Sequence, residues 1–255
     1  MANLRVERSD GVVTFTLDRP ERKNALGPDD WRALAAACAE VAARSEDRVV
    51  VVTGAGNDFC AGADLGALPD GRPLVETMRD VAEAARALRA LPKPTIARVD
   101  GVAVGAGCNL ALCCDLVAAS DRARFAEIFP RRGLSVDFGG SWLLPRLVGL
   151  QRAKQLVLLG DIVDAPTAAS YGLVTEVVAA EQLDRLVTGW ATRLASGPPV
   201  ALALSKELLD AAWGSSFEQA LAAEGHAQAV SVATEDAREG FAAFRERREP
   251  VFKGR

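Results

Sequence analysis

Hydrophobic and polar residues along the first part of the chain predict strands that alternate with helices. Apolar and polar residues alternate in Leu4–Arg8, and Val12–Leu17 is largely apolar; the two stretches flank a Ser-Asp-Gly turn and predict a β-hairpin. Apolar residues recur at helical spacing after Pro28, which predicts a helix that begins there. The run of β-branched residues in Arg48–Thr53 predicts a strand.

The middle of the chain continues this pattern. A helix over Leu74–Arg89 is expected to stop before the Leu91–Pro94 segment, because proline does not continue a helix. The further predicted elements are a strand at Thr95–Val99, a short helix at Gly105–Cys113, strands at Leu116–Ala119 and Ala123–Phe125, a loop at Glu127–Asp137, and a helix from Gly139 through Leu147.

The last third of the chain is predicted to be almost entirely helical. Leu173–Val178 is the strand expected after Leu150, and helices are expected at about 181–195, 199–213, 216–232 and 234–247. The Ser-Gly-Pro-Pro run at Ser196–Pro199 is the clearest internal boundary. The sequence therefore predicts an α/β fold with a core over residues 1–195 and a helical region over residues 196–255.

Composition and charge narrow the class of protein. Of the 255 residues, 49% are hydrophobic and 25% are charged, as in ordinary globular domains. The net charge of −4 argues against nucleic acid as a partner, because no dominant basic field exists to engage phosphates. No long uncharged apolar stretch predicts a membrane span, and no signal peptide is readable, so we expect a cytoplasmic protein. The five cysteines are expected to be reduced and mostly buried.

Several familiar chemistries are disfavoured by the residues present. Gly54 and Gly105 each begin a Gly-x-Gly pattern after a strand, but the third position of a dinucleotide-binding fingerprint is missing in both. The one histidine, His226, lies in the predicted helical region and is expected to be a helix surface or interface residue. We therefore expect no metal site and no Ser-His-Asp triad.

Two glycine-bearing segments carry the most informative pattern. Phe59–Leu65 (FCAGADL) and Val104–Leu110 (VGAGCNL) each read as backbone that turns into a helix, where N–H groups lack partners within the helix. Two such N–H groups aimed at one point would form an oxyanion hole, which stabilises an enolate or a tetrahedral oxyanion. Proton removal next to a thioester carbonyl would need only this hole and one carboxylate with a raised pKa.

The identity of that carboxylate is open on the sequence alone. Asp137 stands between an apolar run and a glycine pair that opens a helix, so it reads equally well as a catalytic acid or as a helix N-cap. Asp64 is expected to cap the helix after it, and Asp115 is expected to form an ion pair at a strand start. Glu127 is expected in a loop from which it could reach the pocket rim.

Six segments together make the chain similar to one enzyme family over essentially its whole length. They are Arg19–Leu26 (RPERKNAL), Val51–Leu65, Pro92–Ala97 (PKPTIA), Asp100–Leu110, Cys114–Leu116 (CDL) and Arg238–Phe241 (REGF). In their order and spacing they resemble the crotonase (enoyl-CoA hydratase/isomerase) superfamily.

The resemblance implies a spiral of ββα units with a C-terminal helical trimerisation region, and a homotrimer or a hexamer built from two trimers. It implies an acyl-CoA substrate and no separate cofactor, with the thioester oxygen held by the N–H groups of Ala63 and Ala106. The positions that it places against CoA or the acyl group are Arg22, Lys23, Ala25, Ala61, Gly62, Asp64, Leu65, Gly105, Gly107, Phe129 and Lys253. The pocket walls are expected from residues 66–80 and 127–142.

One departure from the family pattern bears on the reaction. Asn109 and Phe129 stand where the hydratases carry the two glutamates that hold and activate water, and neither side chain can act as an acid or base. Asp137 falls where isomerase-like members carry an aspartate, in a segment similar to the ring-epoxide isomerases of phenylacetyl-CoA breakdown. The resemblance therefore favours an isomerase in which Asp137 moves the proton and Asn109 orients substrate or water. A divergent hydratase or hydrolase and a catalytically silent acyl-CoA binder remain the alternatives.

Overall fold

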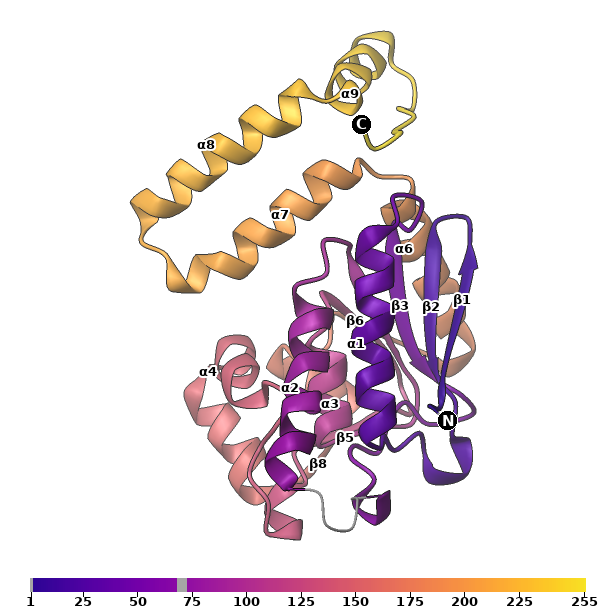
Figure 1. The fold of residues 1–255 in the computed structure, drawn as a ribbon, viewed down its shortest axis with the longest axis vertical. Coiled ribbons are helices and arrows are strands. Elements are labelled where there is room, and N and C mark those ends of the chain that lie inside the picture. Colours follow the sequence, from indigo (N-terminus) through magenta and orange to yellow (C-terminus); the bar gives the residue numbers. More distant parts are fainter. Residues whose placement is uncertain (1, 68–72) are drawn as a thin grey trace.

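A computed structural model describes residues 2–67 and 73–255 of the chain, and its centre is a six-stranded sheet (Figure 1). The strand order is β1-β2-β3-β4-β6-β9, with β1 and β2 antiparallel and the other neighbours parallel. The strands span Leu4–Ser9 (β1), Val12–Leu17 (β2), Val49–Gly54 (β3), Thr95–Val99 (β4), Leu116–Ser120 (β6) and Glu176–Val178 (β9).

Both faces of this sheet are covered, which explains the unbroken valine run in β3. Val50 and Val52 belong to the core that lies under α1 (Pro28–Ala43) and α2 (Leu74–Arg89). Val49 and Val51 point to the opposite face and pack with residues of α6 (Leu183–Ala195) (Figure 1). Full burial of one such side chain is worth about 1.5–3 kcal/mol, so the sheet gains apolar burial on both sides.

A second, three-stranded sheet places two functional segments side by side. It contains β5 (Val102–Val104), β7 (Arg124–Ala126) and β8 (Ile162–Asp164), with β5 parallel to β7 and β7 antiparallel to β8. Gly105, just after β5, donates its N–H to the Ala126 carbonyl at 2.8 Å. The residues that follow β5 and β7 therefore leave the same edge of this small sheet.

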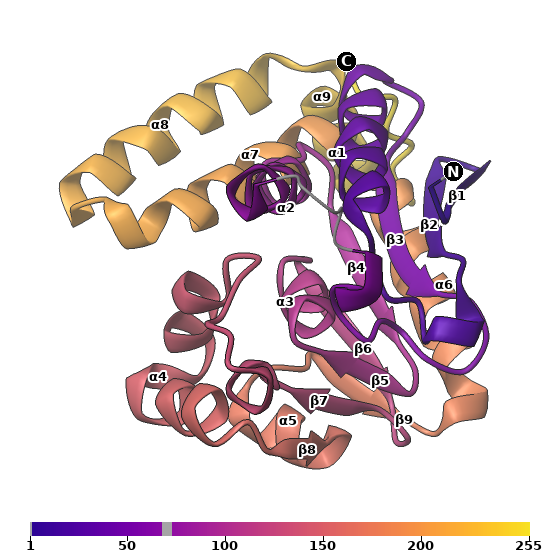
Figure 2. The same ribbon diagram turned by 60° about the horizontal axis from the view of Figure 1, so that its bottom comes forward.

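The remaining helices lie around the core and beyond it. They are α3 (Ala106–Leu112), α4 (Gly140–Leu159), α5 (Ala165–Tyr171), α7 (Pro199–Ala211), α8 (Phe217–Ala233) and α9 (Glu235–Glu246). Short 3-10 turns span Pro20–Arg22 (η1), Leu65–Ala67 (η2), Phe129–Arg132 (η3), Ala180–Gln182 (η4) and Ala212–Gly214 (η5). Helices α7–α9 extend away from the sheets, and α7 crosses near the end of α2 (Figures 1 and 2). Over residues 2–67 and 73–255, none of the helices combines the length and the apolar character needed to cross a membrane.

The predicted α/β order is confirmed, with differences after β4. β5 and β8 were not predicted, because both are three-residue strands without a sustained apolar alternation. The helix expected to end at Leu147 continues to Leu159 across a break at Gly149, whose φ of +74° is not helical. Strand β9 is shorter than expected and begins at Glu176.

Two ion pairs attach α7 to the core. The Lys206 ammonium lies 2.9 Å from the Asp115 carboxylate, which also accepts hydrogen bonds from the Thr95 N–H and hydroxyl groups at 2.7 and 2.9 Å. Arg89, at the end of α2, pairs with Asp210 at 2.8 Å. The expected ion pair of Asp115 at a strand start is thus confirmed. Because the Lys206 side chain is only 11% exposed, removal of this one partner should cost more stability than breaking a surface ion pair does.

We predict that Lys206→Met lowers the free energy of unfolding by about 2 kcal/mol, because it leaves the Asp115 carboxylate without its cation. Lys154→Met, on the exposed face of α4, is the matched control and should change stability by less than about 0.5 kcal/mol. Chemical denaturation measures both variants. Equal effects of the two substitutions would show that the ion pair does not anchor α7.

Candidate functional site

The two glycine segments meet backbone to backbone. A β-carbon on Gly62 would lie 2.7 Å from the Val104 carbonyl oxygen and 3.5 Å from the Ala106 nitrogen, so the two chains approach too closely for a side chain. Gly107 likewise packs against Cys60, where an added β-carbon would lie 2.8 Å from the cysteine β-carbon. A hydrogen bond of 3.0 Å from the Val104 N–H to the Cys60 carbonyl joins the segments. The predicted convergence of these two segments is therefore observed.

The residues after the two glycines have the backbone geometry that an anion site requires. Ala106 is the first residue of α3, so its N–H has no acceptor within the helix. Gly105, before it, has φ +56° and ψ −126°, a conformation that only glycine adopts readily. Ala63 is exposed, and Gly62 before it has φ +94°. Phe129 is buried, with its ring next to Gly105.

The cationic loop lies against the first glycine segment. The Ala61 N–H donates to the Lys23 carbonyl at 2.9 Å, and Leu26, next to Ala25, exchanges backbone hydrogen bonds with Gly62 and Asp64. The Arg22 and Lys23 side chains are exposed. The structure thus brings the predicted CoA-contacting positions of the loop and of residues 61–65 together.

Asp64 has the structural role expected of it. Its carboxylate accepts a hydrogen bond of 3.0 Å from the Gly66 N–H in η2 and pairs with Arg19 at 2.6 Å. Although partial burial opposes ionisation, these contacts hold the pKa of Asp64 below its usual range. Asp64 is therefore a fixed anion in this loop, and Leu65 beside it is 47% exposed.

Lys253 lies apart from the other predicted site residues within one chain. Its backbone N–H donates to the Asp236 carboxylate at 2.6 Å, beside α9, and its side chain is exposed. Gly254 next to it approaches Arg48, which precedes β3, whereas the first glycine segment follows the other end of β3. A contact of Lys253 with CoA would therefore have to be made in a neighbouring subunit.

Asp137 stands on a tight turn just before α4. The Gly140 N–H donates to the Asp137 carbonyl at 2.9 Å, and both central residues have positive φ, +48° at Phe138 and +81° at Gly139. Positive φ is unfavourable for phenylalanine, but the Phe138 ring is buried 5.3 Å from that of Trp31. Packing of the ring therefore holds the turn that presents Asp137.

The N-cap interpretation of Asp137 is wrong. The N-cap of α4 is Gly139, and no side chain caps this helix. The Asp137 Oδ1 atom is buried and has no hydrogen-bond partner among the described residues. Burial raises the pKa of Asp137 to about 6. A carboxyl group with this pKa can both accept and release a proton near neutral pH.

Asn109 is fully buried between α3 and the Asp137 turn. Its Nδ2 atom donates to the Asp137 carbonyl at 3.0 Å and to the Glu127 carboxylate at 3.3 Å. Its side chain lies directly against Gly140, where an added β-carbon would be 2.6 Å from the Asn109 Cγ. The Asn109 Oδ1 atom has no partner among the described residues.

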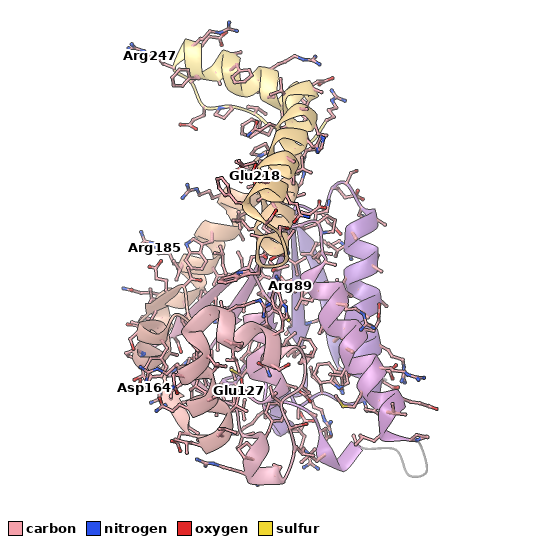
Figure 3. The ribbon with its side chains drawn as sticks, turned by 90° about the vertical axis from the view of Figure 1, so that its left-hand side faces the viewer. Arg89, Glu127, Asp164, Arg185, Glu218 and Arg247 are labelled. Atoms are coloured by element: carbon pink, nitrogen blue, oxygen red, sulfur yellow. The ribbon has the colours of Figure 1, made fainter. Side chains whose placement is uncertain are left out.

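Glu127 is not at the pocket rim, and that prediction is wrong. The side chain, labelled in Figure 3, is 1% exposed, and its carboxylate lies 3.3 Å from the Asn109 Nδ2 atom. Burial, together with the charge of Asp137, raises the pKa of Glu127 to about 7, although hydrogen bonds from Cys108 and Asn109 oppose the shift. The sequence signal that could have placed it is its position directly after the buried strand β7, which pairs with the strand that leads into the second glycine segment.

The cysteines near the glycine segments are not nucleophiles. The five cysteines are free and buried, as predicted. Burial raises the pKa of the Cys60 thiol to about 12 and that of Cys108 well above its ordinary value, so neither supplies a thiolate. His226 is exposed on α8, as expected. The groups able to move protons next to the glycine segments are therefore carboxyl groups.

The predicted pocket walls carry exposed apolar side chains. Leu74, Val75 and Met78 at the start of α2 are 55%, 57% and 37% exposed, and Leu134 in the loop before Asp137 is 47% exposed. Such side chains suit an acyl chain more than a polar ligand. Residues 68–72, which belong to the predicted wall 66–80, lie outside the described residues.

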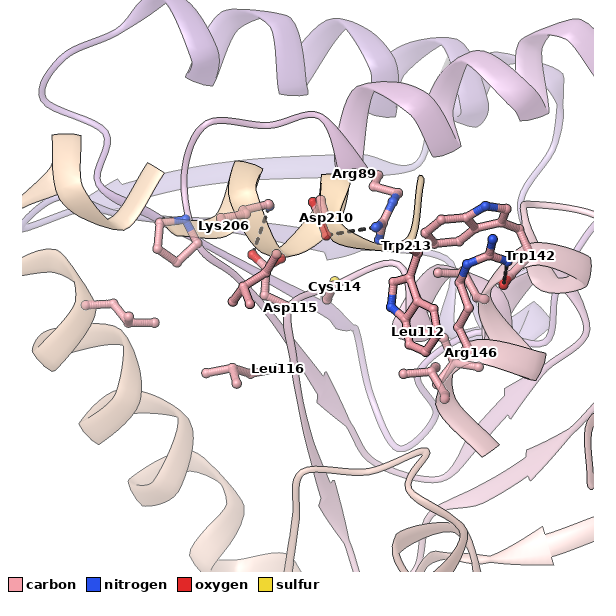
Figure 4. A pocket seen from close by; sticks show the side chains of 15 residues that line it. Arg89, Leu112, Cys114, Asp115, Leu116, Trp142, Arg146, Lys206, Asp210 and Trp213 are labelled. Atoms are coloured by element: carbon pink, nitrogen blue, oxygen red, sulfur yellow. Dashed lines mark hydrogen bonds and ion pairs between the residues drawn. The ribbon is translucent and has the colours of Figure 1, made fainter. Parts of the chain in front are cut away.

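A cavity of about 460 Å³ lies elsewhere, between α4 and the C-terminal helices (Figure 4). The Arg146 guanidinium lies 3.9 Å from the centre of the Trp142 ring and 6.0 Å from that of Trp213, and Arg89 lies 4.5 Å from that of Trp142. None of the predicted site residues lines it. This cavity is therefore a groove between the core and the helical region, separate from the glycine segments.

Comparison with known proteins identifies the relatives of this chain. The family model described as enoyl-CoA hydratase/isomerase matches residues 7–255. A Rhodobacter capsulatus protein named "Probable enoyl-CoA hydratase" is 40% identical over 99% of this chain and 98% of its own length. The 1,2-epoxyphenylacetyl-CoA isomerase of Escherichia coli is 39% identical over 96% of both chains. The crystal structure of an enoyl-CoA hydratase from Bacillus anthracis superposes with a TM-score of 0.95 at 32% identity, over 99% of this chain and 100% of the other.

The raised pKa of Asp137 predicts a pH-dependent cost to stability. In the unfolded chain the group ionises near its ordinary value of 3.8, and in the folded protein only near 6, so stability is lost as the pH rises between these values. We predict that Asp137→Asn raises the free energy of unfolding by up to about 2 kcal/mol at pH 8 and changes it little at pH 4.

Denaturation curves at the two pH values measure this difference, with the exposed Asp161→Asn as the control. A stability difference between Asp137→Asn and wild type that is independent of pH would contradict the burial of an ionised Asp137.

Proposed function

The chain belongs to the enoyl-CoA hydratase/isomerase family, and from this premise we propose that it isomerises an acyl-CoA thioester by moving one proton with Asp137. The substrate class is an unsaturated or epoxide-bearing acyl-CoA. The observation that carries the proposal is that the Asp137 Oδ1 atom is buried and has no hydrogen-bond partner among the described residues. The side chain that donates to the Asp137 backbone carbonyl is an amide, Asn109, and not a second carboxylate.

The proposed reaction begins with substrate held by the two glycine segments. The thioester oxygen accepts hydrogen bonds from the Ala63 and Ala106 N–H groups, and the CoA moiety lies along residues 61–65 and the loop of Arg22 and Lys23. The close backbone contact at Gly62 supports this arrangement, since it fixes both N–H groups before substrate arrives.

Proton transfer then needs one carboxylate. For a 3-enoyl-CoA, ionised Asp137 removes a proton from C2, and the electron pair moves into a dienolate whose negative charge lies on the thioester oxygen. Protonated Asp137 returns the proton to C4, and the double bond lies between C2 and C3. A pKa of about 6 suits both steps. The carboxyl group is ionised at neutral pH and can take the proton, and it is a stronger base than an ordinary aspartate. Asn109 is the proposed group that orients substrate or a water molecule, and its buried Oδ1 atom has no hydrogen-bond partner among the described residues.

A divergent hydratase is the second candidate. It is favoured by the hydratase names of relatives such as the Rhodobacter capsulatus protein. In this alternative Asp137 activates a water molecule that Asn109 positions. Incubation with crotonyl-CoA separates the candidates, because rapid loss of the enoyl absorbance requires hydration and isomerisation of a 3-enoyl-CoA does not. Binding of CoA thioesters without turnover of either substrate would identify a silent acyl-CoA binder.

We also propose that residues 196–255 join subunits in a homotrimer or a dimer of trimers. Helices α7 and α8 bury no residue within one chain. Large apolar side chains of residues 196–255 remain exposed, among them Trp213 at 67%, Phe217 at 74% and Phe244 at 86%. Apolar exposure on this scale marks a contact surface.

We predict that Asp137→Asn and Asp137→Ala each lower kcat for a 3-enoyl-CoA by about 10³-fold, within the range for loss of a general acid–base group. The KM should change little, because the CoA contacts lie on other residues. Asp161→Asn is the matched control on the surface. Near wild-type turnover in either Asp137 variant would remove this residue from the mechanism.

We predict that analytical ultracentrifugation gives three or six times the chain mass of 26.9 kDa. Phe217→Asp should shift the distribution toward smaller species, because it places a charge in the proposed contact surface. A monomer at micromolar concentration would refute the assembly.

A further inference from the structure

Glu127 is a buried carboxyl group that the proposed reaction does not use. Its surroundings are apolar side chains, namely Phe125, Leu144, Leu156, Val163 and Leu173. Over residues 2–67 and 73–255, no lysine or arginine forms an ion pair with it. The polar groups that face it are the Cys108 thiol, the Asn109 amide and, by charge, Asp137. A carboxyl group in such surroundings costs stability, so its presence calls for a function.

The Asn109 amide links Glu127 to the Asp137 turn. The Asp137 carbonyl can only accept a hydrogen bond, so the nitrogen end of the amide must face it. One Nδ2 hydrogen is used there, and the other points to the Glu127 carboxylate. Both donors of the amide are thus occupied, and its oxygen is buried against Gly140 without a hydrogen-bond partner among the described residues.

The Asp137 turn depends on hydrogen bonds and packing from residues outside the turn. An i to i+3 hydrogen bond with positive φ at both central residues is the type I′ pattern, which favours Asn, Asp and Gly rather than Phe. The Asp137 carbonyl accepts the turn hydrogen bond and also the Asn109 hydrogen bond. A rotated Asn109 amide would remove the second bond and release the carbonyl from α3.

We propose that Glu127 is a positioning residue for the proposed reaction, which holds the Asn109 amide in the orientation that fixes the Asp137 turn. This inference rests on the proposed function, in which Asp137 moves the proton. Glu127 does not touch substrate, because Asn109 lies between it and the turn.

Three substitutions test the contact by turnover of a 3-enoyl-CoA. Glu127→Gln keeps the shape and an acceptor oxygen, and its kcat should stay within about 3-fold of wild type. Glu127→Leu removes the acceptor and should lower kcat about 10-fold or more with little change in KM. Glu127→Asp keeps the carboxyl group but shortens the side chain by one methylene, so its kcat should lie between those of the other two variants. This variant tests the proposal even if Glu127→Leu folds poorly.

A double-mutant cycle separates positioning from packing. If Glu127 acts through Asn109, then Glu127→Leu should have no further effect on kcat in an Asn109→Ala background. The proposal would be overturned if the two substitutions lowered kcat independently, so that their effects multiplied. It would also be overturned if Glu127→Leu had the wild-type kcat per folded molecule, or if Glu127→Gln lowered kcat as much as Glu127→Leu.

An infrared titration of the Glu127 carboxyl group tests the link without any substrate, with Glu127→Gln assigning its band. The Asn109 hydrogen bond lowers the pKa of Glu127 and the Asp137 charge raises it, so this pKa should rise in Asn109→Ala and fall in Asp137→Asn. Unchanged titration in both variants would refute the linkage. These shifts do not depend on the reaction, so they would persist if Asp137 proved dispensable for turnover and the proposed function alone had failed.

Discussion

Direct backbone contact between the two glycine segments is the constraint on which the site depends. Gly62 and Gly107 lie so close to the opposite segment that no side chain fits between them. The contact brings together the segments that carry Ala63 and Ala106, although 43 positions separate these two residues along the chain. It also begins α3 at this point, and α3 in turn carries Asn109 to the Asp137 turn. A methyl group at either glycine would force the segments apart and would disturb everything that follows.

Burial of the Asp137 and Glu127 carboxyl groups lowers the stability of the folded chain at neutral pH. Asp137 and Glu127 both have raised pKa values because they lie away from water without a cation. Structural aspartates elsewhere show the opposite arrangement: Asp100 is paired with Arg122 and accepts a hydrogen bond of 2.6 Å from Ser120, and its pKa is lowered. The contrast separates buried carboxyl groups without a cation, which are candidates for a functional role, from aspartates whose ion pairs hold loops in place.

Much of the fold could be predicted from the sequence because its signals are local. The valine run of β3, the helical spacing after Pro28 and the prolines after α2 each fix an element within a few residues. Strands β5 and β8 could not be predicted, since three residues carry no periodicity and their pairing with β7 is a tertiary contact. For the candidate site, motifs singled out the glycine segments and Asp137, and the structure shows the two segments in contact. Glu127 was misplaced, although it directly follows strand β7, because its burial depends on tertiary contacts with Cys108 and Asn109 of α3.

The fate of one hydrogen atom tests the central claim, that a single carboxyl group takes the proton and returns it. A 3-enoyl-CoA labelled with deuterium at C2 is converted in ordinary water, and the product is analysed for label at C4. Transfer by Asp137 alone predicts that part of the deuterium appears at C4. The same transfer of deuterium to C4 in Asp137→Asn, which has no carboxyl group to carry it, would contradict the account.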